Sequence, residues 1–373
     1  MNNRRTLWNI TSVISLLFTV VIITGCSAKG VDTPSTTPES QPAPEPEPTP
    51  EPTPEAPETP VTVTTRKMKN LGIYYGWLTG IDNVHNTDYS NRVDLAAVEI
   101  AKYDRFILGA GLEETSHGDY ANTLTIIEKV HEKNTNTGLY GYVCVGTCAG
   151  GNPNITAIQN SIDKWDTMGI DGIFFDEAGF DYAQPGDSAD SDTRARLASA
   201  VSYAHSKGLK GMINAWNPDD IFVKEPSNPI PWQSGDSFLF ESYMYAESGN
   251  NIVLSDAGSF SDFRIRINKA LSNKPAGVEL WGVSTTGEAV SSFDSAHWTN
   301  LIKMAWADDL TGIGWGTKNY SAVDNSMPFR AVPETLLSFR LDESLTGGSG
   351  LDATVTDGNN TQTTLQSSFS LSP

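Results

Sequence analysis

Short apolar runs recur along the chain from residue 67 to residue 345, and glycine or polar residues close most of them. A short run that is apolar on both faces is typical of a strand in a parallel sheet that is covered on both sides. The pattern predicts eight strands, at residues 72–75, 105–108, 139–145, 172–175, 211–213, 238–240, 277–281 and 312–315.

Helical periods separate most of these strands. Ile155, Ile158, Ile162 and Trp165 form one apolar stripe at helical spacing, and Asn154 in front of them is a typical N-terminal capping residue. Similar stripes predict further helices at residues 91–103, 120–133, 197–207, 263–271 and 298–310.

The alternation of strands and helices predicts an α/β fold, a closed (β/α)8 TIM barrel formed by residues 67–345 as a single globular domain. This length of about 280 residues is typical of one barrel, and eight units favour a closed barrel over an open doubly wound sheet. The weakest unit is 217–233, which is too rich in proline for a full helix.

Several motifs that carry chemistry are absent from the sequence. No G-x-G-x-x-G opens a helix after the first strand and there is no P-loop, so no nucleotide cofactor is indicated. The G-x-S-x-G elbow of serine hydrolases and the H-E-x-x-H helix of zinc proteases are also missing. We therefore expect the protein to need no cofactor.

The N-terminal segment 1–26 resembles a bacterial lipoprotein signal peptide. Two arginines precede a largely apolar run at 10–23, and the small residue Gly25 stands directly before Cys26. We therefore expect Cys26 to carry a lipid and to anchor an extracytoplasmic protein. An uncleaved membrane anchor is the alternative, and it would also place the rest of the chain outside the cytoplasmic membrane.

Segments without an apolar pattern flank the predicted barrel. Residues 27–66 consist mainly of Pro, Glu and Thr, cannot bury a core, and are expected to form a disordered, extended stalk. At about 3.1 Å per residue such a stalk reaches up to roughly 100 Å. Residues 346–373 are rich in Gly, Ser, Thr and Asn and are expected to form a flexible tail.

The net charge of the chain indicates which classes of ligand it can bind. The formal net charge of −20 argues against nucleic acid and anionic lipid headgroups and is compatible with a neutral or cationic ligand. We expect a monomer whose only membrane contact is its lipid anchor.

Apart from Cys26 the chain has only Cys144 and Cys148, for which a disulfide is expected outside the cytoplasm. No histidine or further cysteine accompanies them at a ligand spacing, so no metal site is expected.

The fourth predicted strand runs directly into two acids, Asp176 and Glu177. The carboxyl ends of parallel strands are where α/β folds build their active sites, so this pair is a candidate catalytic centre. The alternative is that Asp176 caps the following helix and that Glu177 is a solvated loop acid.

Aromatic and amide side chains are expected to share this end of the barrel, because they also stand at predicted strand ends. They are Tyr75, Trp77, Asn214, Trp216, Tyr243 and Trp315. Rings cover the apolar faces of pyranoses, and amides and carboxylates bind hydroxyl groups, so the set predicts a sugar-binding cleft. Core packing is the alternative for each ring taken alone.

Hydrolysis of a glycosidic bond needs one carboxylic acid that protonates the leaving oxygen and a second carboxylate that attacks the anomeric carbon or activates water. Asp176, Glu177 and Glu241 are the candidates. Because successive residues of an extended strand point to opposite sides, Asp176 and Glu177 can both face a substrate only if the backbone turns between them. We therefore expect one of the pair to be a positioning acid, and Glu241 to be the partner of the other.

Four short stretches resemble the spherulin-4-like proteins, which are related to glycoside hydrolases of the endo-α-1,4-polygalactosaminidase type. They are Tyr-Tyr-Gly-Trp at 74–77, Gly-Ile-Asp-Gly-Ile-Phe-Phe-Asp-Glu-Ala at 169–178, Asn214, and Phe-Glu-Ser-Tyr at 240–243. The resemblance implies a (β/α)8 barrel and endo-acting cleavage of galactosamine or N-acetylgalactosamine polymers. It matches the acid pair of that group to Asp176 and Glu177, and its later glutamate to Glu241.

Two features have no counterpart in that group: the loop between Cys144 and Cys148, and an acidic insertion at 181–192. Three interpretations of the insertion stay open. It forms the rim of the cleft, it binds Ca²⁺ although it lacks the EF-hand pattern, or it is a solvated loop in which Asp192 caps the next helix.

The leading hypothesis is a surface-anchored glycoside hydrolase that cleaves an amino-sugar polysaccharide. A cell-surface barrel that binds glycans without cleaving them is the alternative, since a fold does not by itself confer an activity. A chitinase-like enzyme is less favoured, because Phe174 and Phe175 interrupt the alternating acids that its mechanism requires.

Overall fold

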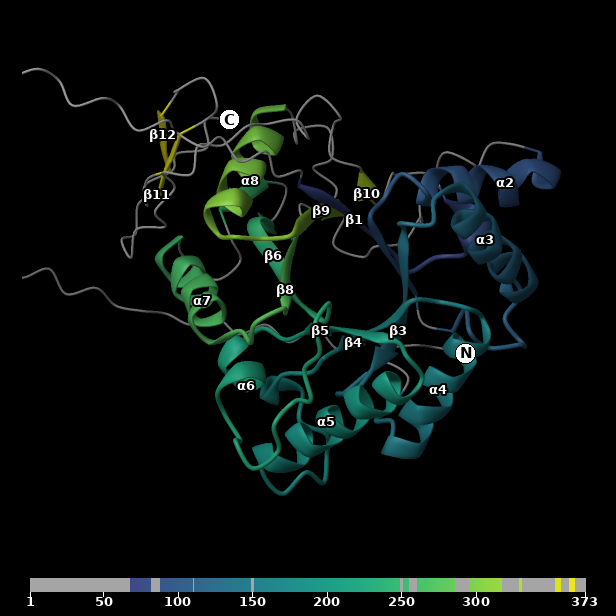
Figure 1. Cartoon of the computed structure of the whole chain (residues 1–373), viewed down its shortest axis with the longest axis horizontal. Coiled ribbons are helices and arrows are strands. Elements are labelled where there is room, and N and C mark those ends of the chain that lie inside the picture. The colour runs from purple at the N-terminus through teal and green to yellow at the C-terminus, as the bar shows by residue number, and fades with distance from the viewer. Residues whose placement is uncertain are drawn as a thin grey trace, which may run out of the picture. The chain divides into compact units, whose positions relative to one another are not determined.

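Eight parallel strands form a closed barrel in the computed structural model, which describes residues 68–81, 88–109, 111–148, 151–248, 251–254, 260–285, 295–316, 329–330, 353–356 and 362–365. Neighbouring strands follow the chain order, and the ring closes where β1 pairs with β9 (Figure 1). The strands are β1 (Lys69–Tyr74), β2 (Arg105–Leu108), β3 (Gly138–Cys144), β4 (Gly172–Asp176), β5 (Lys210–Asn214), β6 (Ser237–Ser248), β8 (Glu279–Thr285) and β9 (Gly312–Gly316). The predicted (β/α)8 barrel and its eight strands are confirmed.

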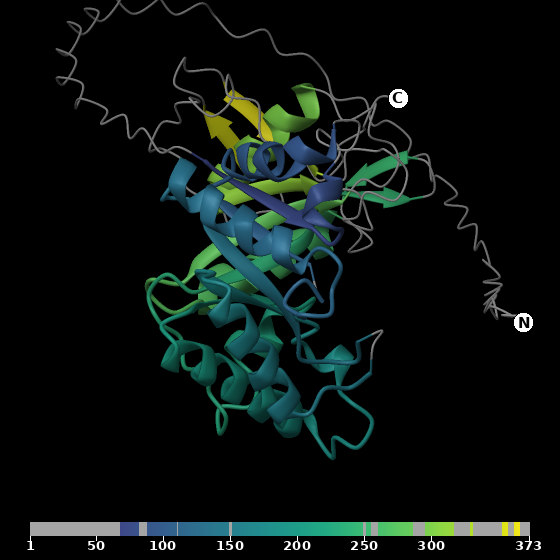
Figure 2. The ribbon, with the colours of Figure 1, turned by 90° about the vertical axis from the view of Figure 1, so that its right-hand side faces the viewer.

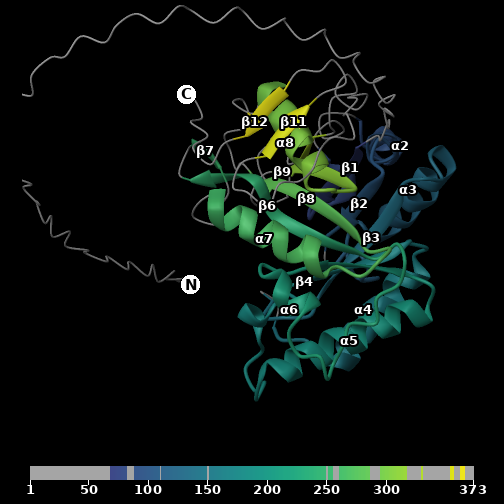
Figure 3. The ribbon, with the colours of Figure 1, turned by 60° about the vertical axis from the view of Figure 1, so that its left-hand side comes forward.

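Helices connect the strands and lie on the outside of the barrel (Figures 1 and 3). They are α2 (Tyr89–Ile100), α3 (Tyr120–Lys133), α4 (Ile155–Thr167), α5 (Asp190–Ser206), α6 (Pro218–Phe222), α7 (Phe260–Asn273) and α8 (Ser295–Ala307), with short 3-10 turns η1 (Leu78–Gly80) and η2 (Phe180–Tyr182). The predicted helices are confirmed. The proline-rich segment forms only the short α6, as its composition predicts.

Two predicted helix caps can be compared with the starts of α4 and α5. Asn154 caps α4 as predicted, because its side chain accepts a hydrogen bond of 2.9 Å from the N–H of Ala157. The expectation that Asp192 caps the next helix is wrong. That helix, α5, begins at Asp190, and Asp192 lies in its first turn, where it accepts hydrogen bonds from Ser188.

Among the described residues, four further strands lie outside the barrel ring. β7 (Asn251–Leu254) pairs antiparallel with the end of β6, and this hairpin extends beyond the ring (Figures 2 and 3). β10 (Phe329–Arg330) pairs antiparallel with β9. The expected flexible tail contains one more antiparallel pair, β11 (Ala353–Thr356) with β12 (Gln362–Leu365). Its β-branched Thr and Val side chains favour strands, which the overall composition of the tail concealed.

The remaining expectations for the ends of the chain lie outside the described residues. These are the signal peptide 1–26 with Cys26, the stalk 27–66, and the other parts of 346–373. Within the described part of the chain, no helix is long and apolar enough to cross a bilayer.

Side chains alternate between two core layers along the strands. One row points into the barrel and forms a core of its own: Leu71, Ile73, Ile107, Tyr140, Phe174, Met212, Leu239, Trp281 and Val283. The alternate positions pack against the helices, as Ile173 and Phe175 do on β4. The inward row therefore decides which residues at the strand ends can face the mouth of the barrel.

Arg105 fills the interior of the barrel at its amino-terminal end. Its guanidinium donates hydrogen bonds to Ser237 Oγ (2.7 Å) and Glu279 Oε2 (3.0 Å). It also lies 4.5 Å from the ring centre of Tyr140 and 4.3 Å from that of Trp281. These cation–π and ionic contacts fill the interior at this end of the barrel.

Candidate active site

The backbone turns sharply where β4 ends, between Asp176 and Glu177. Asp176 is the last residue of the strand, and Glu177 has a left-handed φ of +55°. This conformation costs a residue with a side chain about 1–2 kcal/mol, so tertiary contacts must hold it. The turn meets the condition under which two adjacent acids can both reach the barrel mouth. Asp176 does not cap the next helix, because α5 begins only at Asp190.

Asp176 continues the inward row of β4 two residues after Phe174. Its carboxylate accepts a hydrogen bond of 2.8 Å from the hydroxyl of Tyr142 on β3. Burial raises the pKa of Asp176 from 3.8 to about 6, against the opposing hydrogen bonds from Tyr142 and from the backbone of Glu177. A carboxyl group with this pKa still holds its proton in a useful fraction of molecules near neutral pH.

Glu177 faces the loop between Cys144 and Cys148, which the structure joins by a disulfide. Burial raises the pKa of Glu177, while hydrogen bonds from the backbone and the side chain of Thr147 oppose that rise. The Sγ of Cys144 lies 3.7 Å from Glu177 Oε2. At Gly146, an added Cβ would come within 2.5 Å of the Glu177 carbonyl oxygen, so only glycine allows this close approach. The disulfide loop thus holds Glu177 from one side.

Glu241 lies on the part of β6 that pairs with β8, opposite Val283. Asn214, at the end of β5, donates a hydrogen bond of 3.4 Å from Nδ2 to Glu241 Oε2. The strand loses its regular register directly afterwards, between Glu241 and Ala246, and Ser242 has a left-handed φ of 52°. The regular part of β6 therefore ends at the acid, as the regular part of β4 does.

The three carboxylates gather around two tyrosines. Burial raises the pKa of Tyr142 strongly, and the negative charges of Asp176, Glu177 and Glu241 raise it further. The pKa of Tyr182 is also raised, by burial and then by the charges of the same three acids and of Asp181. The structure therefore brings the three predicted acids to one place at the barrel mouth.

Tyr142 and Tyr182 were not predicted as site residues. Tyr142 stands two positions after Tyr140 on β3, so the alternation of the strand was a signal that could have placed it in the inward row. Tyr182 lies in the 3-10 turn that follows the acid pair, and no periodicity marks it.

Two of the expected sugar-binding residues lie beside the acids. Tyr75 packs edge to face against Tyr142, with ring centres 5.3 Å apart, and Asn214 contacts Glu241 as described. Trp77 is 54% exposed at the end of β1 and packs against the ring of His117, 5.2 Å away.

Tyr243 and Trp315 lie in the core instead of at the mouth, which corrects the expectation that they bind substrate. Both are fully buried in the layer between the barrel and the helices. The Tyr243 hydroxyl donates a hydrogen bond of 2.7 Å to Asp308 at the end of α8. Trp315 follows the outward residue Ile313 by two positions and thus shares its face. A strand-end position alone did not reveal which face these rings occupy.

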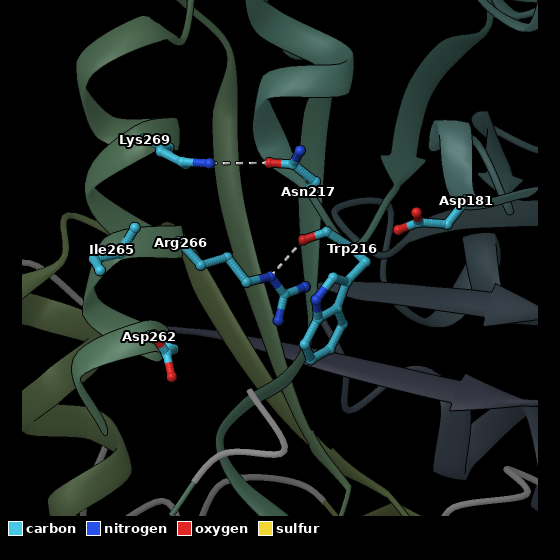
Figure 4. Close-up of a pocket in the computed structure, with 7 residues that line it drawn as sticks. All are labelled: Asp181, Trp216, Asn217, Asp262, Ile265, Arg266 and Lys269. Atoms are coloured by element: carbon cyan, nitrogen blue, oxygen red, sulfur yellow. Dashed lines mark hydrogen bonds between the residues drawn. The ribbon is translucent and has the colours of Figure 1, made fainter. Parts of the chain in front are cut away.

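A pocket of about 350 Å³ lies between the loop after β5 and helix α7 (Figure 4). It is lined by Asp181, Trp216, Asn217, Asp262, Ile265, Arg266 and Lys269. Trp216, the last of the expected sugar-binding residues, is thus part of a concave surface.

The described residues contain one close group of three possible metal ligands, Cys144, Cys148 and Glu177, within 4.8 Å of one another. The two sulfurs form a disulfide and are not thiolates, so this donor set does not fit a metal ion. In the acidic insertion, Asp187 forms a two-pronged ion pair with Arg196, at 2.9 Å for both contacts. This pairing favours a loop that is held by the protein itself.

No protein-family model matches the chain, and no curated protein matches its sequence. Among solved structures, the glycoside hydrolase domain of PelA from Pseudomonas aeruginosa is similar with a TM-score of 0.44 and 12% identity, covering 67% of this chain and 95% of that one. Ega3 of Aspergillus fumigatus in complex with galactosamine has a TM-score of 0.40 and 11% identity, covering 71% and 98%. A D-psicose 3-epimerase in the presence of D-fructose has a TM-score of 0.40 and 14% identity, covering 66% and 83%.

Proposed function

We propose that this protein is a surface-anchored glycoside hydrolase that cleaves an amino-sugar polysaccharide of the galactosamine or N-acetylgalactosamine type. The observation that supports it most is the gathering of Asp176, Glu177 and Glu241 around Tyr142 at the barrel mouth. Two carboxyl groups with different surroundings are what glycosidic cleavage requires. The likeness of residues 169–178 to the spherulin-4-like proteins supports the same class of substrate.

In this proposal Asp176 is the proton donor. Its raised pKa keeps a proton available for the leaving glycosidic oxygen, and Tyr142 fixes the orientation of the carboxyl group through the 2.8 Å hydrogen bond. Once the oxygen has taken the proton, the bond to the anomeric carbon breaks and the leaving sugar departs as an alcohol.

Glu241 is the second carboxylate, which attacks the anomeric carbon or removes a proton from an attacking water. Asn214 holds its carboxylate from β5, and the two strands thereby fix it relative to Asp176. Glu177 is the positioning acid, because Thr147 and the disulfide loop hold its side chain. The negative charge of Glu177 adds to the rise in the pKa of Asp176.

The surroundings of the barrel suit an extracytoplasmic polymer. A lipid on Cys26 and the stalk 27–66 would hold the barrel at a distance from the membrane while it acts on matrix or cell-surface material. The acidic balance of the chain would attract a polymer with free amino groups.

Release of reducing ends from galactosaminoglycan tests the proposal. We expect the unmutated chain to cleave the polymer, and Asp176→Asn and Glu241→Gln to lower kcat by about 10²-fold or more. Glu177→Gln should have a smaller effect. Binding without cleavage across a panel of amino-sugar polymers would favour the non-catalytic glycan-binding barrel and overturn the hydrolase.

A further inference from the structure

The pocket between the loop after β5 and helix α7 contains a ring that is held rigidly. Arg266 on α7 is buried, and its guanidinium lies 4.1 Å from the ring centre of Trp216. Its Nε also donates a hydrogen bond of 2.7 Å to the backbone oxygen of Trp216, as Figure 4 shows. The cation–π contact restrains the indole ring, and the hydrogen bond restrains the backbone that carries it. The side chain therefore loses little conformational entropy when a ligand packs on the ring.

The same arginine ties the pocket to the catalytic strand. Its Nη1 donates a hydrogen bond of 2.8 Å to the backbone oxygen of Glu241. On the other side, Asp181 of the pocket precedes Tyr182, whose pKa responds to the charges of the three site acids. Arg266 therefore links the pocket directly to the strand that carries Glu241.

The lining of the pocket combines one aromatic ring with hydrogen-bonding groups. Lys269 is engaged by Asp219 (2.6 Å) and by Asn217 (3.4 Å) within the protein. The exposed carboxylates of Asp181 and Asp262 lie on opposite sides of Trp216 (Figure 4). An aromatic face with carboxylates beside it matches the apolar face and the polar rim of a pyranose. The volume of about 350 Å³ lies at the small end of the range for ligand pockets, which suits a unit of a chain more than a large ligand.

We infer that this pocket is a second sugar subsite, which holds a non-reacting pyranose unit of the substrate beside the unit that is cleaved. Trp216 supplies the platform, Asp181 and Asp262 accept hydrogen bonds from the ring substituents, and Arg266 couples the occupied platform to Glu241. The inference rests on the proposed function, because it names the part of the polymer that this site recognises.

A tetramer of α-1,4-linked galactosamine is a suitable probe, and the full chain carrying Asp176→Asn should cleave it about 10²-fold more slowly, which leaves time to measure binding. Calorimetric titration should show binding that Trp216→Ala weakens about tenfold, as the loss of an aromatic platform predicts. Trp216→Tyr, which keeps a ring, should bind within about threefold of the parent. Asp94→Asn, an exposed acid on α2 outside the pocket, serves as the control and should bind like the parent.

A spectroscopic readout keeps the inference testable if Trp216→Ala fails to fold. In protein labelled with 5-fluorotryptophan, the resonance missing from Trp216→Tyr belongs to Trp216, and it should shift when the tetramer is added. A tetramer that binds without moving this resonance, or a cleaving enzyme that does not bind the tetramer, would overturn the subsite while leaving the hydrolase intact. A shifted resonance in a protein that cleaves no polymer would overturn the hydrolase and keep the subsite as a glycan-binding site.

Discussion

Asp176 and Glu177 are neighbours in the chain but have different surroundings. Asp176 lies at the end of the inward row and accepts a hydrogen bond from the hydroxyl of Tyr142, whereas Glu177 has a left-handed backbone and accepts hydrogen bonds from Thr147. Burial raises the pKa of both carboxyl groups, and at Glu177 hydrogen bonds from the backbone and side chain of Thr147 oppose the rise. These different surroundings underlie the separate roles that the proposed function gives the two acids, one as proton donor and one as positioning acid.

The raised pKa of Asp176 predicts a trade-off between stability and activity. Because the folded state favours the proton, Asp176 contributes to the free energy of unfolding below about pH 3.8, and this contribution is lost as the pH rises through about 6. Asp176→Asn cannot ionise and should therefore increase the free energy of unfolding at pH 7.5. The side chain keeps some contact with solvent, so we expect about 1–2 kcal/mol.

Denaturant unfolding at about pH 3.5 and pH 7.5 measures this effect. At the lower pH the variant and the unmutated protein should unfold at nearly the same denaturant concentration. Asp94→Asn removes a surface acid that is paired with Lys129 and should give no gain at either pH. A gain of equal size at both pH values would show that it does not come from the ionisation of Asp176.

At the scale of elements, the strands and helices could be predicted and the shape of their ends could not. A buried parallel strand needs both faces apolar, and that requirement leaves a clear pattern in the sequence. The turn at Glu177 depends on contacts with the loop after β3, which is distant in the chain, so no local pattern encodes it. The register loss after Glu241 likewise has no local signal, so the outward Tyr243 was assigned to the mouth, whereas the alternation of β3 could have placed Tyr142 in the inward row.

The disulfide loop after β3 offers a test of how an element positions an acid. Thr147→Val keeps the shape of the side chain but removes the hydroxyl that donates to Glu177, whereas Thr147→Ser keeps the hydroxyl. We expect Thr147→Val to lower kcat about tenfold with little change in KM, because one hydrogen bond to a charged group is lost and the sugar contacts remain. Initial rates on galactosaminoglycan measure both constants.

Rescue by Thr147→Ser distinguishes positioning from general damage to the loop. The serine variant should regain most of the rate, and the pH profile of Thr147→Val should move toward higher pH, because the lost hydrogen bond had lowered the pKa of Glu177. If both variants lose the same activity with an unchanged pH profile, Thr147 supports only the shape of the loop.

At the scale of the whole molecule, an acidic chain presents three carboxylates at one end of a barrel. The net charge of −20 and the acids at the mouth create a negative potential. This potential would attract a polymer with free amino groups before the two molecules touch. A fully N-acetylated polymer carries no such charge, so the two forms of one sugar chain separate electrostatic attraction from direct recognition.

Salt dependence tests this attraction. The Debye length falls from about 10 Å at 0.1 M salt to about 3 Å at 1 M, so KM for the deacetylated polymer should rise several-fold over that range. KM for the N-acetylated polymer should change little, because its binding depends on stacking and hydrogen bonds. Rates measured on both polymers at matched length provide the comparison. If KM for both polymers responds equally to salt, the charge of the protein does not select its substrate. If only KM for the deacetylated polymer responds, charge is part of recognition.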